Sequence, residues 1–332
     1  MAKKSVSKSL AEHVSSLPTQ LSLFQIIPSE DQRYSNTVEL YDALPKYVWS
    51  KITQKGRLDA IRREFVFRSR NYRIRIVPAN LEGEHGESID RFPRVREEHV
   101  EDGLRLLASR GQGVFLDEAA AVVFTLYELQ QELKRLGHSY SYPELKEAIL
   151  VLRGTQIEVS TPDGVKVVHS NLFETVAFDE IDEVTGKRAK AFVRFNTLVT
   201  RSIMAGQFQP LNIETASRIK TIIGRHLYKR MSHLFRQASI TNPYTILAST
   251  IIRDFGLKPY ANFRFNLREI REALDELVQA EVLLDWKVEE VKAKQKRQNK
   301  LTDAKFILTT SPDFNQSMRA NNAKMAKHMD KG

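Results

Sequence analysis

Hydrophobic residues follow a helical period in the first half of the chain and then alternate as in strands. The helical runs are 100–108, 125–137 and 142–154, and the strand-like runs are 156–160 and 165–169. Thr125 and Glu128 have the spacing of a capping box, and Pro143 lies in the first turn of the third helix. Three helices followed by a two-stranded ribbon predict a winged helix.

The same order of elements recurs in the second half. The expected helices span 213–238, 244–255 and 266–280, and the expected wing strands span 283–291 and 305–309. The repeat predicts an α+β fold with tandem winged-helix domains. We expect a disordered N-terminal arm at 1–35, a first winged-helix domain at 36–206, a second at 207–310, and a polar, frayed tail at 311–332.

The segments around the first three helices have weaker patterns. We expect a short helix within 41–53, a hairpin with its turn near 69–71, a charged loop over 80–94, a strand at 190–195 and a short helix at 197–204. The hairpin carries Arg68, Arg70, Arg73 and Arg75, which suit either DNA or an acidic protein neighbour.

The composition limits the function classes. The chain has 332 residues and no cysteine, which excludes disulfides and thiolate chemistry. With 42% hydrophobic residues and no long apolar run, we expect a cytoplasmic protein that contacts no membrane. The net charge of +10 favours a polyanionic partner, although any single basic cluster can simply be a solvated surface.

The third helix of a winged helix enters the major groove, so its N-terminal end should carry DNA contacts in the second unit. We predict contacts from Lys258, Tyr260, Asn262, Arg264, Asn266, Arg268 and Arg271, and from the wing residues Lys292, Lys294, Lys296 and Arg297. Further along this helix, Glu269, Glu272, Asp275 and Glu276 restrict the contact to the first turn and the preceding loop.

In the first unit, hydroxyl groups and one lysine precede and begin the third helix. Ser139, Ser141, Tyr142 and Lys146 are suited to phosphate contacts, which carry no base specificity. A winged helix can equally pair two protein chains, so this surface has two interpretations.

Enzyme motifs are missing from the sequence. It contains no GxxxxGK[ST] phosphate loop, no His-x-His pair and no HExxH motif. His226 and His233 are expected to be surface or partly buried residues rather than metal ligands. We therefore expect no catalysis and no cofactor.

A short apolar motif lies near the N-terminus. Gln20, Leu21, Ser22, Leu23 and Phe24 closely resemble the motif by which bacterial replication proteins bind the sliding clamp. The same side chains can instead fold back onto their own domain.

These features together resemble the iteron-type replication initiators of bacterial plasmids (the replication initiator A family). The matching runs are 124–129, 152–158 and Arg225-His226-Leu227-Tyr228, together with Ile270, Ala273, Leu274, Glu276, Leu277 and Arg268 on the third helix of the second unit. The resemblance implies binding to double-stranded origin DNA, pairing of two copies, and recruitment of the sliding clamp, the replicative helicase and its loader. A tandem winged-helix transcriptional repressor is the alternative.

Overall fold

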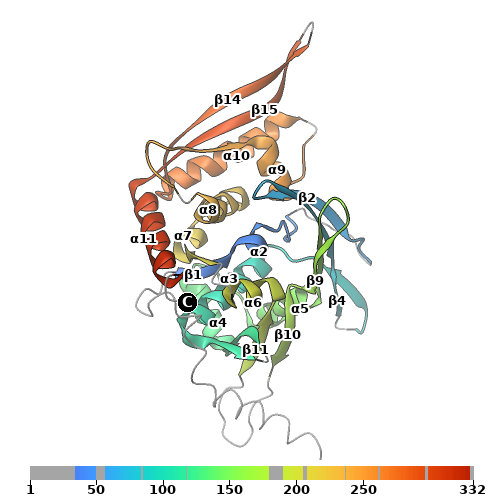
Figure 1. Cartoon of the computed structure of the whole chain (residues 1–332). Coiled ribbons are helices and arrows are strands. Elements are labelled where there is room, and N and C mark those ends of the chain that lie inside the picture. The colour runs from blue at the N-terminus through green and yellow to red at the C-terminus, as the bar shows by residue number, and fades with distance from the viewer. Residues whose placement is uncertain are drawn as a thin grey trace, which may run out of the picture.

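Three helices and a hairpin recur in the two halves of the chain, as Figure 1 shows for the computed structural model. The structure describes residues 34–49, 57–83, 85–116, 118–178, 190–204, 208–235, 237–260, 262–295 and 298–329. The predicted fold class, tandem winged helices in an α+β chain, is confirmed by this element order.

The first unit is built on the predicted three helices and wing. They are α3 (Val95–Leu107), α4 (Leu126–Arg135) and α5 (Tyr142–Gly154), followed by β8 (Gln156–Ser160) and β9 (Lys166–Asn171). The backbone N–H of Glu128 donates to Thr125 Oγ1 at 3.1 Å, and its carboxylate accepts from the Thr125 N–H at 2.6 Å. Gly137 follows the C-cap of α4, Leu136, and its φ of +88° suits a residue without a Cβ.

Two four-stranded sheets flank these helices. The predicted hairpin, β2 (Ile61–Phe67) and β3 (Arg70–Val77), joins the wing in the order β2-β3-β8-β9. The second sheet has the order β10-β11-β7-β6, formed by Phe173–Phe178, Ala191–Phe195, Ala119–Phe124 and Gly113–Leu116. Shorter elements are α2 (Glu39–Ala43), the π-helical turn η2 (Ala108–Gln112) and α6 (Thr197–Met204).

The segment 80–94 differs from its prediction as a loop. It contains a small hairpin of β4 (Ala79–Glu82) and β5 (Ser88–Arg91). Asp90 stabilises its base, because its carboxylate accepts from Asn80 Nδ2 at 2.7 Å and from the Leu58 N–H at 2.7 Å.

The second unit has the full winged-helix order. It consists of α7 (Ile213–Arg218), α8 (Ile222–Leu234), β13 (Tyr244–Leu247), α9 (Ala248–Asp254), α10 (Phe263–Gln279), β14 (Leu283–Gln295) and β15 (Gln298–Thr310). Each wing strand has 13 residues, and the wing projects far from the body of the molecule (Figure 1).

The predicted continuous helix over 213–238 is wrong, because it breaks between Ile219 and Thr221. Thr221 begins α8 as its N-cap, with its side chain accepting from the Gly224 N–H at 3.2 Å. The Glu276 carboxylate of α10 accepts from the Lys220 and Thr221 N–H groups at 2.6 and 2.9 Å. A residue 55 positions away thus stabilises the break.

Two further predictions need correction. Residues 244–247 form a strand rather than the start of a helix, because β13 pairs with β15. The C-terminal segment predicted as a frayed tail instead contains α11 (Pro312–Met329), whose Phe314 and Met318 are buried in the second core.

The two units meet along an extensive seam. Strand β1 (Tyr34–Val38) pairs with β12 (Phe208–Asn212), which leads into the second unit. Leu106 and Leu136 come from helices of the first unit but belong to the second core. Helix α8 packs against α2, and α9 packs against β2 of the first unit, as the neighbouring ribbons in Figure 1 show.

Candidate nucleic-acid interface

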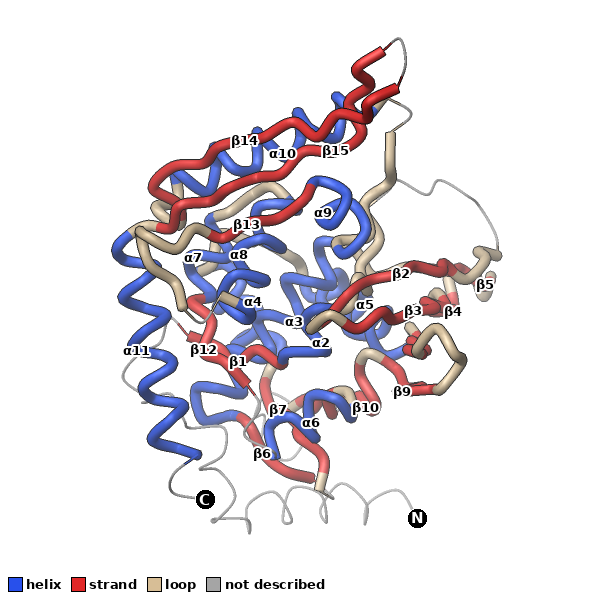
Figure 2. Tube along the Cα trace, turned by 45° about the horizontal axis from the view of Figure 1, so that its top comes forward, coloured by secondary structure: helices blue, strands red, loops and turns tan. Residues whose placement is uncertain are grey.

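Helix α10 and the wing form one end of the molecule. Figures 1 and 2 both show the tip of the β14–β15 hairpin beyond the N-terminal end of α10. The loop before α10 and its first turns are exposed at Lys258, Arg264 and Arg268, and the Arg268 side chain is 66% exposed. Three cations therefore surround the helix end that a winged helix inserts into the major groove.

The two asparagines of this region have structural partners. Asn262 is the N-cap of α10, and its side chain accepts from the Arg264 N–H at 3.1 Å. Asn266, predicted to contact DNA, is 2% exposed. Its Oδ1 accepts from the Tyr260 N–H at 3.0 Å and its Nδ2 donates to the Lys258 carbonyl at 3.4 Å, so it positions the loop instead of meeting bases.

The acidic residues of α10 are each engaged within the protein. Glu269 accepts from the Tyr260 hydroxyl at 2.8 Å, a hydrogen bond that raises the pKa of Tyr260. Asp275 accepts from Trp286 Nε1 at 2.9 Å, and Glu272 lies 3.7 Å from Arg268 Nε. Glu276, also on α10, accepts hydrogen bonds from the backbone at the start of α8. The carboxylates of α10 thus have partners within the protein, which accounts for an acidic helix surface beside the basic N-terminal end.

The predicted wing cations lie partly outside the described residues. Lys292 is half-exposed, with its ammonium 3.1 Å from Glu290. Lys294 belongs to β14, whereas Lys296 and Arg297 lie outside the described residues. Arg271 is half-buried on α10.

In the first unit, the candidate residues divide by role. The Ser141 hydroxyl donates to Glu144 at 2.7 Å in the capping box of α5, and the hydrogen bonds from Ser141 lower the pKa of Glu144. Ser139, Tyr142 and Lys146 are exposed, and the Lys146 ammonium lies 5.9 Å from the Phe178 ring centre.

The hairpin arginines also divide. Arg73 lies 3.1 Å from Glu64 and Arg75 lies 3.2 Å from Glu158, which supports the acidic-neighbour interpretation for these two. Arg68 and Arg70 are exposed at the turn. Strand β2 contacts the second unit, because the Val66 N–H donates to Asp254 of α9 at 3.0 Å.

Sequence analysis missed a buried ion-pair network across the seam. Glu98 of α3 is fully buried and lies 3.1 Å from Arg225 and 3.0 Å from Lys229 of α8. Burial alone would raise the pKa of Glu98, but Lys229 and Arg225 outweigh it and hold the pKa well below its usual range. The run Arg225-His226-Leu227-Tyr228 is visible in the sequence, but nothing in the sequence connects it to α3.

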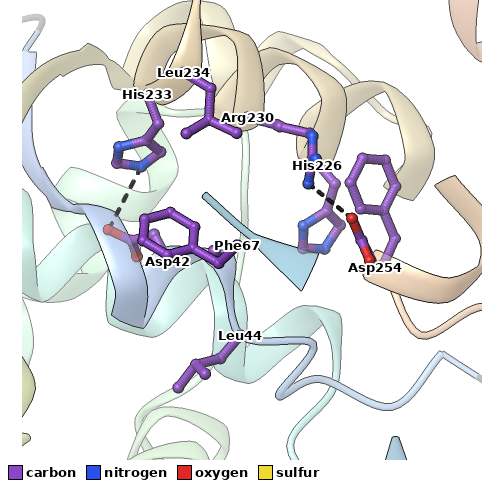
Figure 3. A pocket seen from close by; sticks show the side chains of 10 residues that line it. Asp42, Leu44, Phe67, His226, Arg230, His233, Leu234 and Asp254 are labelled. Carbon is purple, nitrogen blue, oxygen red and sulfur yellow. Dashed lines mark ion pairs between the residues drawn. The ribbon is translucent and has the colours of Figure 1, made fainter. Parts of the chain in front are cut away.

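The histidines of α8 lie at the same seam. Figure 3 shows His226 and His233 beside Asp42, Arg230 and Asp254 around a cavity of about 30 Å³. His226 packs between Trp49 and Phe255, with ring centres 5.1 and 5.4 Å apart, and His233 is 4% exposed. Burial lowers the pKa of His226 to about 4.

Two kinds of feature are absent from the described residues. Within the ranges given above, no three His, Asp or Glu side chains are placed to hold a metal ion. Among the helices of those ranges, none combines the length and apolarity needed to cross a membrane.

The fold and this surface define a tandem winged-helix protein with a basic recognition-helix end. No family model matches the sequence, and no curated protein matches it in sequence. Two structures of domains 2 and 3 of RctB share 9% and 10% identity, each with a TM-score of 0.46. They cover 81% and 83% of this chain, and 96% and 98% of their own.

A third solved structure is the Pi initiator protein in complex with iteron DNA. It shares 14% identity at a TM-score of 0.46, and the match covers 67% of this chain and 92% of that one. An iteron-binding initiator, the kind of protein that the motifs resembled, is thus among the matches.

Proposed function

We propose that this chain binds duplex DNA sequence-specifically through α10 and the β14–β15 wing, and that it acts as a replication initiator at repeated origin sites. The observation that carries the proposal is the exposed first two turns of α10, where Arg264 and Arg268 lie beside a long basic wing. Arginine is suited to guanine edges in the major groove, and lysines of a wing are suited to phosphates.

The structure of the loop supports this use of α10. Asn262 and Asn266 fix the helix start and the preceding turn by hydrogen bonds, so the arginines project from a rigid base. A fixed backbone lowers the entropy lost when side chains meet a base pair. Glu269 and Asp275 accept hydrogen bonds from Tyr260 and Trp286, and Glu272 lies beside Arg268, so these carboxylates have partners within the protein.

The full-length chain should enrich a defined sequence from a pool of random duplexes. Arg268→Ala should bind that sequence less tightly, whereas Arg201→Ala, an exposed arginine on α6, should bind as the wild type does. Equal binding by both variants would contradict the assignment of α10 as the recognition helix.

An initiator and a repressor differ in what DNA binding accomplishes. We infer the initiator from the iteron-type motifs and from the clamp-binding motif at Gln20–Phe24, which lies outside the described residues. A plasmid whose only origin is this gene with its upstream DNA should be maintained in a bacterial host. Repression of the gene's own promoter without plasmid maintenance would favour the repressor.

The clamp contact has its own test. Leu23→Ala combined with Phe24→Ala should abolish capture of the purified bacterial sliding clamp, because both apolar side chains are lost. Ser22→Ala, within the same motif, should retain capture. DNA affinity should be unchanged in all variants, and absence of clamp binding by the wild type would refute this contact.

The exposed residues of the first unit complete the proposal. Ser139, Tyr142 and Lys146 at the start of α5 are suited to phosphate contacts, which would extend the site without adding base specificity. Pairing of two copies and recruitment of the helicase with its loader remain part of the proposed initiator function.

A further inference from the structure

An aromatic side chain is exposed on the first turn of α10. Phe265 is 46% exposed and lies between the two arginines of the proposed recognition surface, Arg264 and Arg268. Tyr260, 44% exposed, lies beside it, and the other exposed large apolar residues in the described part of the second unit are Ile240, Leu247, Leu284 and Val291. Phe265, with Tyr260 beside it, is thus the apolar component of a basic surface.

The ring of Phe265 is held in place from two sides. The Tyr260 ring meets it at 62° with ring centres 6.1 Å apart, and the Tyr260 hydroxyl is fixed by its hydrogen bond to Glu269. The guanidinium of Arg268 lies 5.3 Å from the Phe265 ring centre on the same helix. An exposed ring with two such neighbours has little side-chain freedom left to lose on binding.

This position lacks the residue that would complete a capping box at the start of the helix. Phe265 is the third residue after the N-cap Asn262, where α3, α4 and α5 have Glu97, Glu128 and Glu144 in capping boxes. A glutamate there would accept from the N-cap N–H and interact favourably with the helix dipole. A half-exposed phenylalanine does neither, so a contact outside the chain accounts better for its presence.

The surroundings of Phe265 select the occupant. Lys258, Arg264 and Arg268 favour a polyanion, and the first turn of a winged-helix recognition helix faces the major groove. The apolar group that a base pair offers in that groove is the C5-methyl group of thymine. We propose that Phe265 is a specificity-determining residue that contacts a thymine methyl group next to the base pair that Arg268 contacts. This inference rests on the DNA-binding function proposed above.

Replacing thymine by deoxyuridine removes only the methyl group, so it isolates the contact. The probe is the duplex that the wild-type chain enriches from a random pool. In a series of such duplexes, each thymine in turn is replaced by deoxyuridine. At one thymine, deoxyuridine should weaken wild-type binding about fourfold, the effect of one buried methyl group. The same replacement should leave the affinity of Phe265→Ala unchanged.

Further variants make the result specific. Phe265→Leu keeps an apolar side chain and should retain sensitivity to the methyl group. Phe265→Gln has a polar side chain at this half-exposed position, so it should lose that sensitivity, and it replaces the alanine variant if that one unfolds. Leu284→Ala removes an exposed apolar residue of β14 and should respond to deoxyuridine as the wild type does.

The outcomes separate this inference from the proposed function. The methyl contact is overturned if no deoxyuridine replacement changes the affinity for the specific duplex. It is also overturned if a replacement changes the affinities of the wild type and Phe265→Ala equally. The proposed DNA binding stands in both cases. Tighter binding to the single strand than to the duplex of that sequence also overturns the methyl contact, because the ring would then stack on a base. Failure to enrich any duplex overturns the DNA-binding function and this inference together.

Discussion

Arg268 and Lys292 are both exposed cations of the second unit, but they lie on elements with different access to DNA. Arg268 is on the first turns of α10, and Lys292 is on the wing. Arg268→Ala should cost about 1–3 kcal/mol at the specific site and relax one base preference. Lys292→Ala should weaken specific and random duplexes alike and reduce the slope of log affinity against log salt by about one.

Competition binding at several salt concentrations measures both effects. The result that contradicts the assignment is loss of discrimination in Lys292→Ala with full discrimination in Arg268→Ala.

His226 should make the stability of the protein depend on pH. Burial lowers its folded pKa to about 4, with Lys229, Arg225 and Lys46 acting in the same direction and Glu98 opposing. The unfolded chain, with a histidine pKa near 6.5, therefore binds a proton that the folded chain does not, and stability falls as pH falls from about 6.5 toward 4. Between pH 7 and 5 the loss should be about 1–2 kcal/mol for this residue.

His226→Phe keeps the ring contacts with Trp49 and Phe255 but cannot titrate. Urea unfolding from pH 7 to pH 5 should show a smaller loss of stability in this variant. His85→Gln, at an exposed histidine, is the control and should behave as the wild type does. An unchanged pH dependence in His226→Phe would show that another group dominates.

At the scale of elements, helix α11 has a largely polar sequence and still packs against the second unit. Its Phe314 packs edge-on against Tyr228 of α8, with ring centres 6.2 Å apart, and the Asn321 side chain donates to the Pro210 carbonyl at 3.1 Å. The helix therefore fastens the C-terminal segment to α8 and β12.

Phe314→Ala should lower the free energy of unfolding by about 3–5 kcal/mol, because it removes a buried ring and leaves a cavity. Arg319→Ala, exposed on the same helix, should change it by less than about 0.5 kcal/mol. Urea unfolding of the full chain measures both, and equal stabilities would mean that α11 contributes little.

The elements that were predicted well have their signals in neighbouring residues. The capping box at Thr125 and the Pro at position 143 predicted α4 and α5, because both devices act within one helical turn. The wrong predictions concern segments whose structure depends on residues far along the chain. Glu276 accepts from the backbone at the break between α7 and α8, and pairing with β15 makes residues 244–247 a strand. In the site, the basic first turn of α10 was visible in the sequence, but the burial of Asn266 was not, because it depends on how the loop folds.

At the scale of the whole molecule, the buried ion pairs connect the two units. Glu98→Gln keeps the shape of the side chain but leaves Arg225 and Lys229 without that charge, so the free energy of unfolding should fall by about 3–5 kcal/mol. The depressed pKa of Glu98 means that its contribution is present above the unfolded pKa and is lost only as pH falls through the lower folded value.

Glu158→Gln is the matched control, because it removes a pair with Arg75 that is partly exposed. Its effect should stay below about 1 kcal/mol. Equal effects of the two variants in urea unfolding at pH 7 would show that the seam is not held by this network.

The pairing of β1 with β12 has a consequence for the order in which the chain is made. Val38 and its partner Phe208 are separated by 170 positions, so β1 is synthesised long before β12 exists. At translation rates of roughly 5–20 residues per second, the strand waits about 10–30 s for its partner. Glu98 likewise waits for Arg225 and Lys229. The first unit therefore completes its structure only after the ribosome has begun the second, and a chain released before residue 212 would expose an unpaired strand edge to other nascent chains.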